Sequence, residues 1–100
     1  MPSANNDSNY WEMVSQFIEQ ANAHTEERTP GEVASALLNA AARYSAFYLA
    51  GSSESRKDLK EDKDVLVQDV SREFKKRFAE ELEDYIENYK VYFEHEEASE

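Results

Sequence analysis

Apolar residues recur along most of this chain at intervals of three and four positions, the spacing that places side chains on one face of an α-helix. The pattern covers residues 9–24, 30–51 and 55–93. After Gly51 the chain runs 49 residues to Glu100 without a glycine or a proline, the residues that most often end helices. We predict an all-α fold, a small helical bundle of three main helices of which the third is long, kinked or split into two.

The first predicted helix runs from Asn9 to about His24. Asn9 is a suitable N-cap, and Glu12 stands three positions later, as in a capping box. The apolar face of this helix is formed by Trp11, Val14, Ile18 and Ala21. The short charged connector that follows, residues 25–28, suits an antiparallel helical hairpin.

The second predicted helix has the clearest start signal in the sequence. Thr29 is a suitable N-cap, Pro30 has the fixed φ that favours the first helical position, and Glu32 completes a capping box. The single charge of residues 33–50 is Arg43, and apolar side chains surround most of the axis, so we expect the buried core helix of the domain. Gly51 is placed to cap its end.

A membrane span over residues 33–50 is disfavoured, because Arg43 lies near the middle of the segment and much of the rest is alanine. We therefore expect no membrane contact from this helix.

The third predicted helix has two halves. Residues 52–64 are polar and form either an exposed helix start or part of a loop. A strong apolar stripe follows, with members four positions apart: Leu66, Val70, Phe74, Phe78 and Leu82. Because each step of four rotates the stripe by about 40°, the two halves face directions about a quarter of a turn apart. A kink or a change of packing partner near residues 74–78 would explain this rotation.

Length and composition indicate one domain. The chain has 100 residues, of which 40% are apolar, enough for a modest core. We expect a disordered N-terminus over residues 1–8, a helical domain over 9–93 and a disordered acidic tail over 94–100. The sequence has no cysteine and its first residues have no signal-peptide pattern, so a cytoplasmic location is expected.

The net charge of −11 argues against nucleic acid and anionic lipid as partners, because phosphates would be repelled. The charge is unevenly distributed along the third helix. Residues 56–77 have eight bases and six acids, whereas residues 78–100 have nine acids and one base. This asymmetry suits antiparallel pairing of the helix with a second copy of itself.

No catalytic or metal-binding pattern emerges from the titratable residues. Neither His24 nor His95 belongs to the Glu-x-x-His pattern of di-iron bundles. The acidic group of residues 80–87 lacks the loop spacing that binds Ca²⁺. We expect no metal, no cofactor and no enzymatic activity.

Two sets of residues are candidate sites. Arg43, Asn39 and Tyr44 form the first, in which Arg43 is either an anion or ligand contact or a structural residue paired with a carboxylate such as Asp69 or Glu73. The second is a candidate protein interface on the last helix, formed by Phe78, Leu82, Tyr85, Tyr89 and Tyr92.

Three segments give the chain a family resemblance: Thr29-Pro30-Gly31, residues 40–47 (AAARYSAF) and residues 82–89 (LEDYIENY). With these segments the chain resembles a family of short bacterial proteins catalogued as a domain of unknown function, over about residues 10–92. The resemblance implies a small cytoplasmic bacterial protein and one intact domain. It implies no activity and no binding residue.

The sequence therefore predicts a non-enzymatic helical interaction module that forms a homodimer through its last helix or binds another protein there. Two alternatives stay open: a small-ligand or anion binder with a pocket around Arg43, and an acidic decoy for a nucleic-acid-binding protein. The biological role, the partner and the oligomeric state are left open by the sequence.

Overall fold

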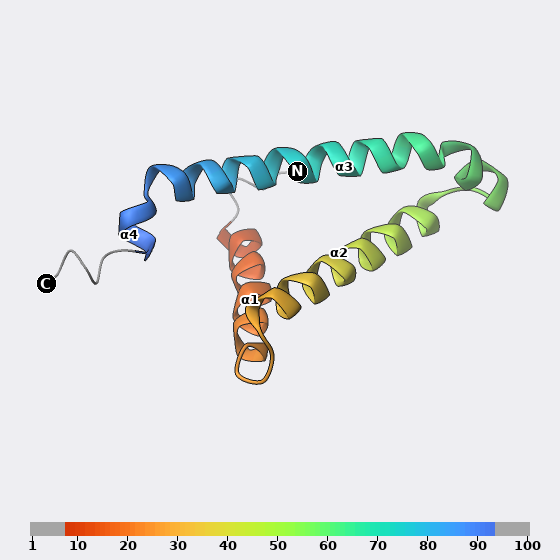
Figure 1. Ribbon diagram of the computed structural model, residues 1–100. Coiled ribbons are helices and arrows are strands. Elements are labelled where there is room, and N and C mark those ends of the chain that lie inside the picture. The colour runs from red at the N-terminus through yellow and green to blue at the C-terminus, as the bar shows by residue number, and fades with distance from the viewer. Residues whose placement is uncertain (1–7, 94–100) are drawn as a thin grey trace, which may run out of the picture. The chain divides into compact units, whose positions relative to one another are not determined.

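Helices are the only regular secondary structure over residues 8–93, the part of the chain that the computed structural model describes (Figure 1). The helices are α1 (Ser8–His24), α2 (Pro30–Ser52), α3 (Arg56–Glu87) and the short α4 (Tyr89–Phe93). The prediction of an all-α fold with three main helices and a long third one is confirmed. The chain divides into two compact units, Met1–Ser52 and Ser53–Glu100, which we describe separately.

In the first unit, α1 begins at Ser8. Asn9 therefore lies inside the helix, and the prediction that it is the N-cap was wrong. Ser8 also lies inside α1, although it was expected to belong to the disordered N-terminus. The rest of that segment and the acidic tail, 1–7 and 94–100, lie outside the described residues.

The start of α2 is a capping box at the predicted position. The backbone N–H of Glu32 donates to Thr29 Oγ1 at 3.2 Å, and the N–H of Thr29 donates to Glu32 Oε1 at 3.1 Å. Two backbone donors that a helix start leaves without partners are thereby satisfied. Arg28 adds a weak exposed ion pair, with Nη1 3.7 Å from Glu32 Oε2.

The end of α2 differs from the prediction. The helix continues through Gly51 to Ser52, and no described glycine has a positive φ. Gly51 therefore does not act as a left-handed C-cap. Ser52 extends the helix because its hydroxyl donates to the carbonyl of Tyr48 at 2.9 Å.

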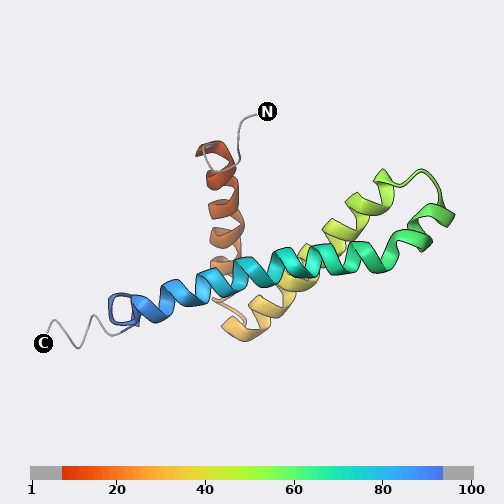
Figure 2. The same cartoon turned by 90° about the horizontal axis from the view of Figure 1, so that it is seen from above.

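The expected buried core around α2 is not formed within its unit. No residue of α2 is buried, and Val33, Ser45 and Leu49 are half-buried. The two helices diverge from their connecting turn, so that α1 faces only the N-terminal half of α2 (Figure 2). A helix that is apolar on most sides needs neighbours on more than one side, and α1 is a single neighbour.

The second unit consists of α3 and α4. The sequence left open whether residues 52–64 are the start of a helix or part of a loop. The structure shows that residues 56–64 are helical. Ser55 is the N-cap, because its side chain accepts a hydrogen bond from the backbone N–H of Asp58 at 3.1 Å. The 32 residues of α3 give a length of about 48 Å at 1.5 Å per residue.

The break in the last helix is real, but it lies further along the chain than predicted. α3 is continuous through residues 74–78, where a kink was expected, and ends at Glu87. The interruption is at Asn88, whose φ of −116° and ψ of 28° are not helical. The rotating apolar stripe therefore lies on one continuous helix.

Among residues 8–93, no helix is both long enough and apolar enough to cross a membrane. This agrees with the position of Arg43 within the most apolar segment of the sequence.

The capping box allows a direct test of what defines the start of α2. Thr29→Ala removes the hydroxyl that accepts from Glu32 N–H, and we expect the free energy of unfolding to fall by about 1 kcal/mol. Thr29→Ser keeps the hydroxyl and is the control, with a change of a few tenths of a kcal/mol at most, about the scatter of exposed sites. Urea unfolding followed by circular dichroism measures both, and equal stability of Thr29→Ala and the parent protein would contradict the assignment.

Candidate functional site

Aromatic side chains gather where α3 ends and α4 begins. Tyr85 lies beside Tyr92, with ring centroids 4.8 Å apart, and beside Phe93 at 5.8 Å. Tyr89 also contacts Phe93, at 5.0 Å. We call these four residues, Tyr85, Tyr89, Tyr92 and Phe93, the C-terminal aromatic cluster. All four remain exposed, with Tyr85 the least at 39%.

Asp84 holds this cluster in place. One carboxylate oxygen accepts from Tyr92 Oη at 3.0 Å, and the other accepts from Asn88 Nδ2 at 3.0 Å. The backbone carbonyl of Asp84 accepts from the N–H of Asn88, also at 3.0 Å. Asp84 therefore links the last turn of α3, the interrupting residue and α4, and it determines how α4 turns back toward Tyr85.

The same contact changes the acidity of a tyrosine. The hydrogen bond to Asp84, and then the negative charge of Asp84, raise the pKa of Tyr92 above its ordinary value of 10.0. The cause is that the carboxylate stabilises the protonated phenol and repels the phenolate.

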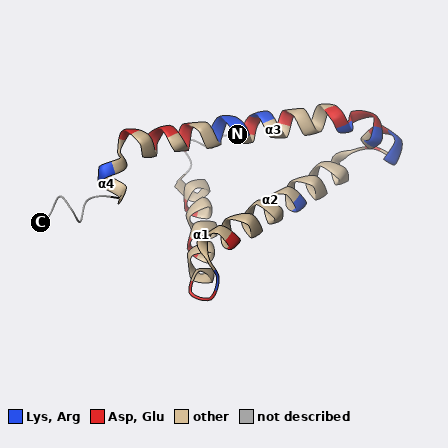
Figure 3. Ribbon diagram, viewed as in Figure 1, with Lys and Arg blue, Asp and Glu red and all other residues tan. Residues whose placement is uncertain are grey.

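The surroundings of the cluster are acidic. Acidic residues predominate along the last part of α3, whereas its first and middle parts have both basic and acidic residues (Figure 3). Within residues 78–93 the five acids are Glu80, Glu81, Glu83, Asp84 and Glu87, and the one base is Lys90. The site therefore combines aromatic area with negative charge, which suits a protein surface that has apolar and basic groups.

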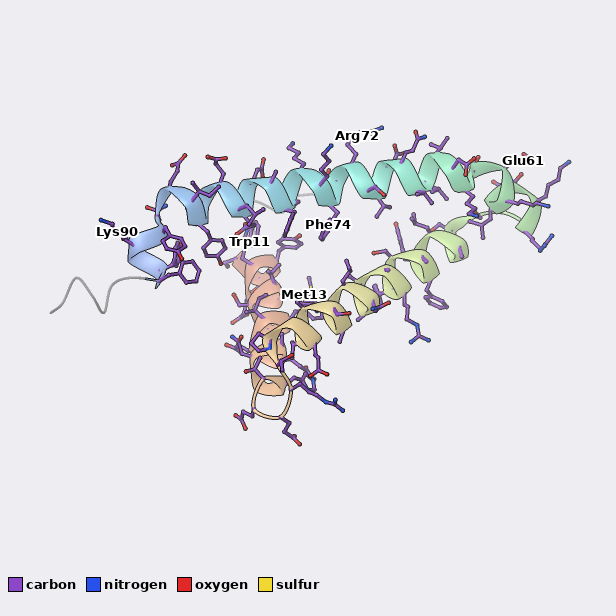
Figure 4. All side chains as sticks on the ribbon, viewed as in Figure 1. Trp11, Met13, Glu61, Arg72, Phe74 and Lys90 are labelled. Atoms are coloured by element: carbon purple, nitrogen blue, oxygen red, sulfur yellow. The ribbon has the colours of Figure 1, made fainter. Side chains whose placement is uncertain are left out.

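The structure brings together some of the predicted interface residues and leaves others apart. Tyr85, Tyr89 and Tyr92 belong to the cluster. Phe78 instead stacks on Phe74, with centroids 5.7 Å apart and rings inclined by 11°. Phe74 and Arg72 leave opposite sides of α3 (Figure 4). Leu82 lies between the stacked pair and the cluster along the chain, and it is exposed.

The residues of the second predicted set, Asn39, Arg43 and Tyr44, lie exposed on α2. Tyr44 is 77% exposed and Phe47 is 79% exposed, so neither encloses Arg43. Asn39 Nδ2 donates to the carbonyl of Ser35, one turn earlier in the same helix, at 3.0 Å. Arg43 is exposed and makes no ion pair with a residue of the described chain.

The carboxylates suggested as partners of Arg43 have other partners. Asp69 pairs with Arg72 at 3.1 Å, and Glu73 pairs with Arg77 at 3.0 Å, both within α3. A ligand site around Arg43 stays a prediction, and burial does not support it.

A groove that the sequence did not indicate lies between α1 and α2 and has a volume of about 570 Å³. Its lining is mainly apolar, with Phe17, Ala21, Val33 and Leu37 among its residues, and His24, Arg28 and Glu32 add polar groups. Phe17 is 61% exposed, so the groove is open to solvent. It does not include Arg43, Asn39 or Tyr44.

Metal binding has no candidate in the described part of the chain, where no group of three or more His, Asp or Glu side chains is placed to hold an ion. His24 lies in the last turn of α1. His95 lies outside the described residues.

The contact between Asp84 and Asn88 is the feature of the site that sequence reasoning did not identify. The available signal was their spacing, since Asp84, Asn88 and Tyr92 follow one another at intervals of four. That spacing indicates side-chain contact only when the backbone conformation at Asn88 is known.

The raised pKa of Tyr92 gives a pH prediction with a definite sign. A group whose folded pKa is raised stabilises the folded state below its unfolded pKa, and that contribution is lost as the pH rises through the folded pKa. The Asp84 contact should therefore persist at neutral pH and disappear in alkali, above the ordinary tyrosine value of 10.0. NMR titration of the labelled Tyr92 ring measures this.

Two substitutions test the cause of the Tyr92 shift. Asp84→Asn should lower the pKa of Tyr92, because it removes the charge that disfavours the phenolate. Glu83→Gln removes the same charge one residue away, without the hydrogen bond, and should have much less effect. An unchanged pKa of Tyr92 in Asp84→Asn would contradict the contact.

The exposure of Arg43 also has a measurable consequence. Arg43→Met should change the free energy of unfolding by no more than about 0.5 kcal/mol, as at other exposed sites without a structural contact. Thermal unfolding with and without added inorganic phosphate measures stability and anion binding together. A loss of several kcal/mol would show that Arg43 is structural, and loss of a phosphate-induced stabilisation would favour an anion site.

Comparison with known proteins identifies the family of this chain. The family model described as "Protein of unknown function (DUF3144)" matches residues 10–86, so α4 and the residues Tyr89, Tyr92 and Phe93 lie beyond the matched region. No curated protein and no solved structure matches the chain. The match covers more than half of the chain, and the chain therefore belongs to this family of proteins of unknown function.

Proposed function

We propose that this chain is a non-enzymatic helical interaction module that self-associates through the last part of α3 and α4. The observation that carries the proposal is the C-terminal aromatic cluster, a set of aromatic side chains that is ordered by Asp84 and yet exposed. Aromatic residues of this kind provide much of the binding energy in protein interfaces.

The fixed positions of the side chains in the cluster support a role in binding a partner. A side chain that is already fixed loses less conformational entropy when a partner covers it. Tyr92 is fixed by its hydrogen bond to Asp84, and the rings of Tyr85, Tyr89 and Phe93 contact one another. The surface is thus preorganised for contact with another protein.

The limited burial within each unit supports self-association. Within the described part of the second unit, residues 53–93, α3 has the five residues of α4 as its one helical neighbour, and no residue of either helix is buried. A helix cannot cover its own apolar side chains, so its stripe gains stability from an additional surface. A second copy of the chain supplies such a surface at equal concentration, and closed homodimers are the commonest oligomers.

The experiment removes two rings of the cluster and measures the dissociation constant of the dimer. The double substitution Tyr85→Ala, Tyr89→Ala should weaken self-association by about 2 kcal/mol or more, since buried interface tyrosines each cost more than 1 kcal/mol when truncated. Sedimentation equilibrium over a range of concentrations measures this. Circular dichroism verifies that the helix content is kept.

The chain provides a matched control in Tyr44→Ala, Tyr48→Ala. These tyrosines are also four positions apart and exposed, but they lie on α2. We expect the control to keep the dissociation constant of the parent protein. A parent protein that is monomeric at tens of micromolar would overturn the proposal, and so would equal weakening by both double substitutions.

A further inference from the structure

α3 has an uninterrupted row of apolar residues at intervals of four, which forms a ridge along the helix surface. Its members are Leu66, Val70, Phe74, Phe78, Leu82 and Ile86. The two central rings, Phe74 and Phe78, stack nearly parallel and are 55% and 54% exposed. They form an apolar surface at the middle of the row.

The row is symmetric about its midpoint at Lys76. Reversing the chain direction about this point exchanges Phe74 with Phe78, Val70 with Leu82 and Leu66 with Ile86, so an apolar residue always replaces an apolar residue. A two-fold axis relating two antiparallel helices performs this exchange, because it places the same surface of both copies in contact. Because each step of four turns the row by about 40°, its central members, Val70 to Leu82, share one face, and this central part is self-complementary in the antiparallel sense.

The distribution of charge along α3 also favours antiparallel over parallel pairing. In a parallel pair the acidic segment 78–93 would face its own copy, and like charges would repel. In an antiparallel pair it faces residues 59–74 of the other copy, which have three bases and five acids, so like charges repel less than in the parallel pair. Two bases there, Lys60 and Lys63, fall on the same side of an ideal helix as Phe74.

When the midpoint is the axis, Lys63 of one copy lies at about the level where α3 of the other copy ends and the aromatic cluster begins. Lys63 is thirteen positions before Lys76, and Tyr89 is thirteen positions after it. An ammonium group beside tyrosine rings and carboxylates gains both cation–π and ion-pair contacts.

Ion pairs within α3 reduce the repulsion between basic side chains of the two copies near the axis. Arg77 Nε lies 3.0 Å from Glu73 Oε2, and Arg72 Nη1 lies 3.1 Å from Asp69 Oδ1. Two arginines close to the midpoint therefore already have carboxylate partners in their own helix.

We infer that two copies of α3 pair antiparallel about a two-fold axis at Lys76, with the stacked Phe74 and Phe78 at the centre and Lys60 and Lys63 of each copy on the aromatic cluster of the other. The inference rests on the self-association proposed above and adds its orientation and register.

Pulsed electron spin resonance of spin-labelled protein tests the orientation. The parent sequence has no cysteine, so Glu61→Cys, Lys76→Cys and Glu87→Cys each introduce a single label site. Glu61 is fifteen residues from the axis, which at 1.5 Å per residue places the two labels about 45 Å apart along the helix direction in the antiparallel dimer. The Lys76 labels should be much closer, and the Glu87 labels should be at an intermediate distance.

Each outcome of the distance measurement has a separate meaning. Short distances at all three positions would show a parallel dimer, overturning this inference while the proposed self-association stands. A shortest distance at Glu61 or Glu87 would move the axis away from Lys76 and overturn the register. Absence of dipolar coupling at every position would show a monomer and overturn the proposed function itself.

A second experiment tests the lysine contact. Lys60→Glu, Lys63→Glu should weaken the dimer about tenfold, since each exchange acts twice in a symmetric interface and exposed ion pairs contribute a few tenths of a kcal/mol each. Lys75→Glu, Lys76→Glu makes the same charge change away from the apolar face and is the control. Equal weakening by both pairs would show a general charge effect and overturn the contact.

Discussion

A helix satisfies its own backbone hydrogen bonds but not the burial of its own apolar side chains. Most features of this chain follow from that difference. The capping box at Thr29, the Ser55 cap and the bonds around Asn88 complete the backbone requirements locally. The apolar faces of α2 and α3 have no comparable local solution. Stability gained from these faces depends on surfaces that the individual helix does not provide.

The sequence predicted best where a local interaction decides the structure. The capping box depends on Thr29, Pro30 and Glu32 within a single turn, so the start of α2 is where it was expected. The cap at Ser55 is equally local, yet the uniformly polar region around it concealed the signal. The family resemblance inferred from three short segments is also confirmed, because the family model matches residues 10–86.

The predictions that were wrong rested on sequence patterns that more than one local structure can satisfy. Gly51 can adopt a left-handed cap, but a glycine can also remain helical when the next residue, here Ser52, bonds back to the preceding turn. The rotating stripe on α3 suggested a kink near Phe74, but a continuous helix with an inclined ridge presents the same pattern. The position of the break was decided by Asp84 and Asn88, a side-chain contact that periodicity does not include.

The uninterrupted length of α3 constrains which insertions and deletions the chain can accept. One residue added between Phe74 and Asp84 would rotate the aromatic cluster by about 100° relative to the apolar ridge, onto a different side of the helix. Seven residues, two helical turns, would restore the alignment to within about 20°. Length variation in this segment is therefore tolerable mainly in multiples of the helical repeat, even though the segment is exposed and its individual substitutions are not constrained by packing within the unit.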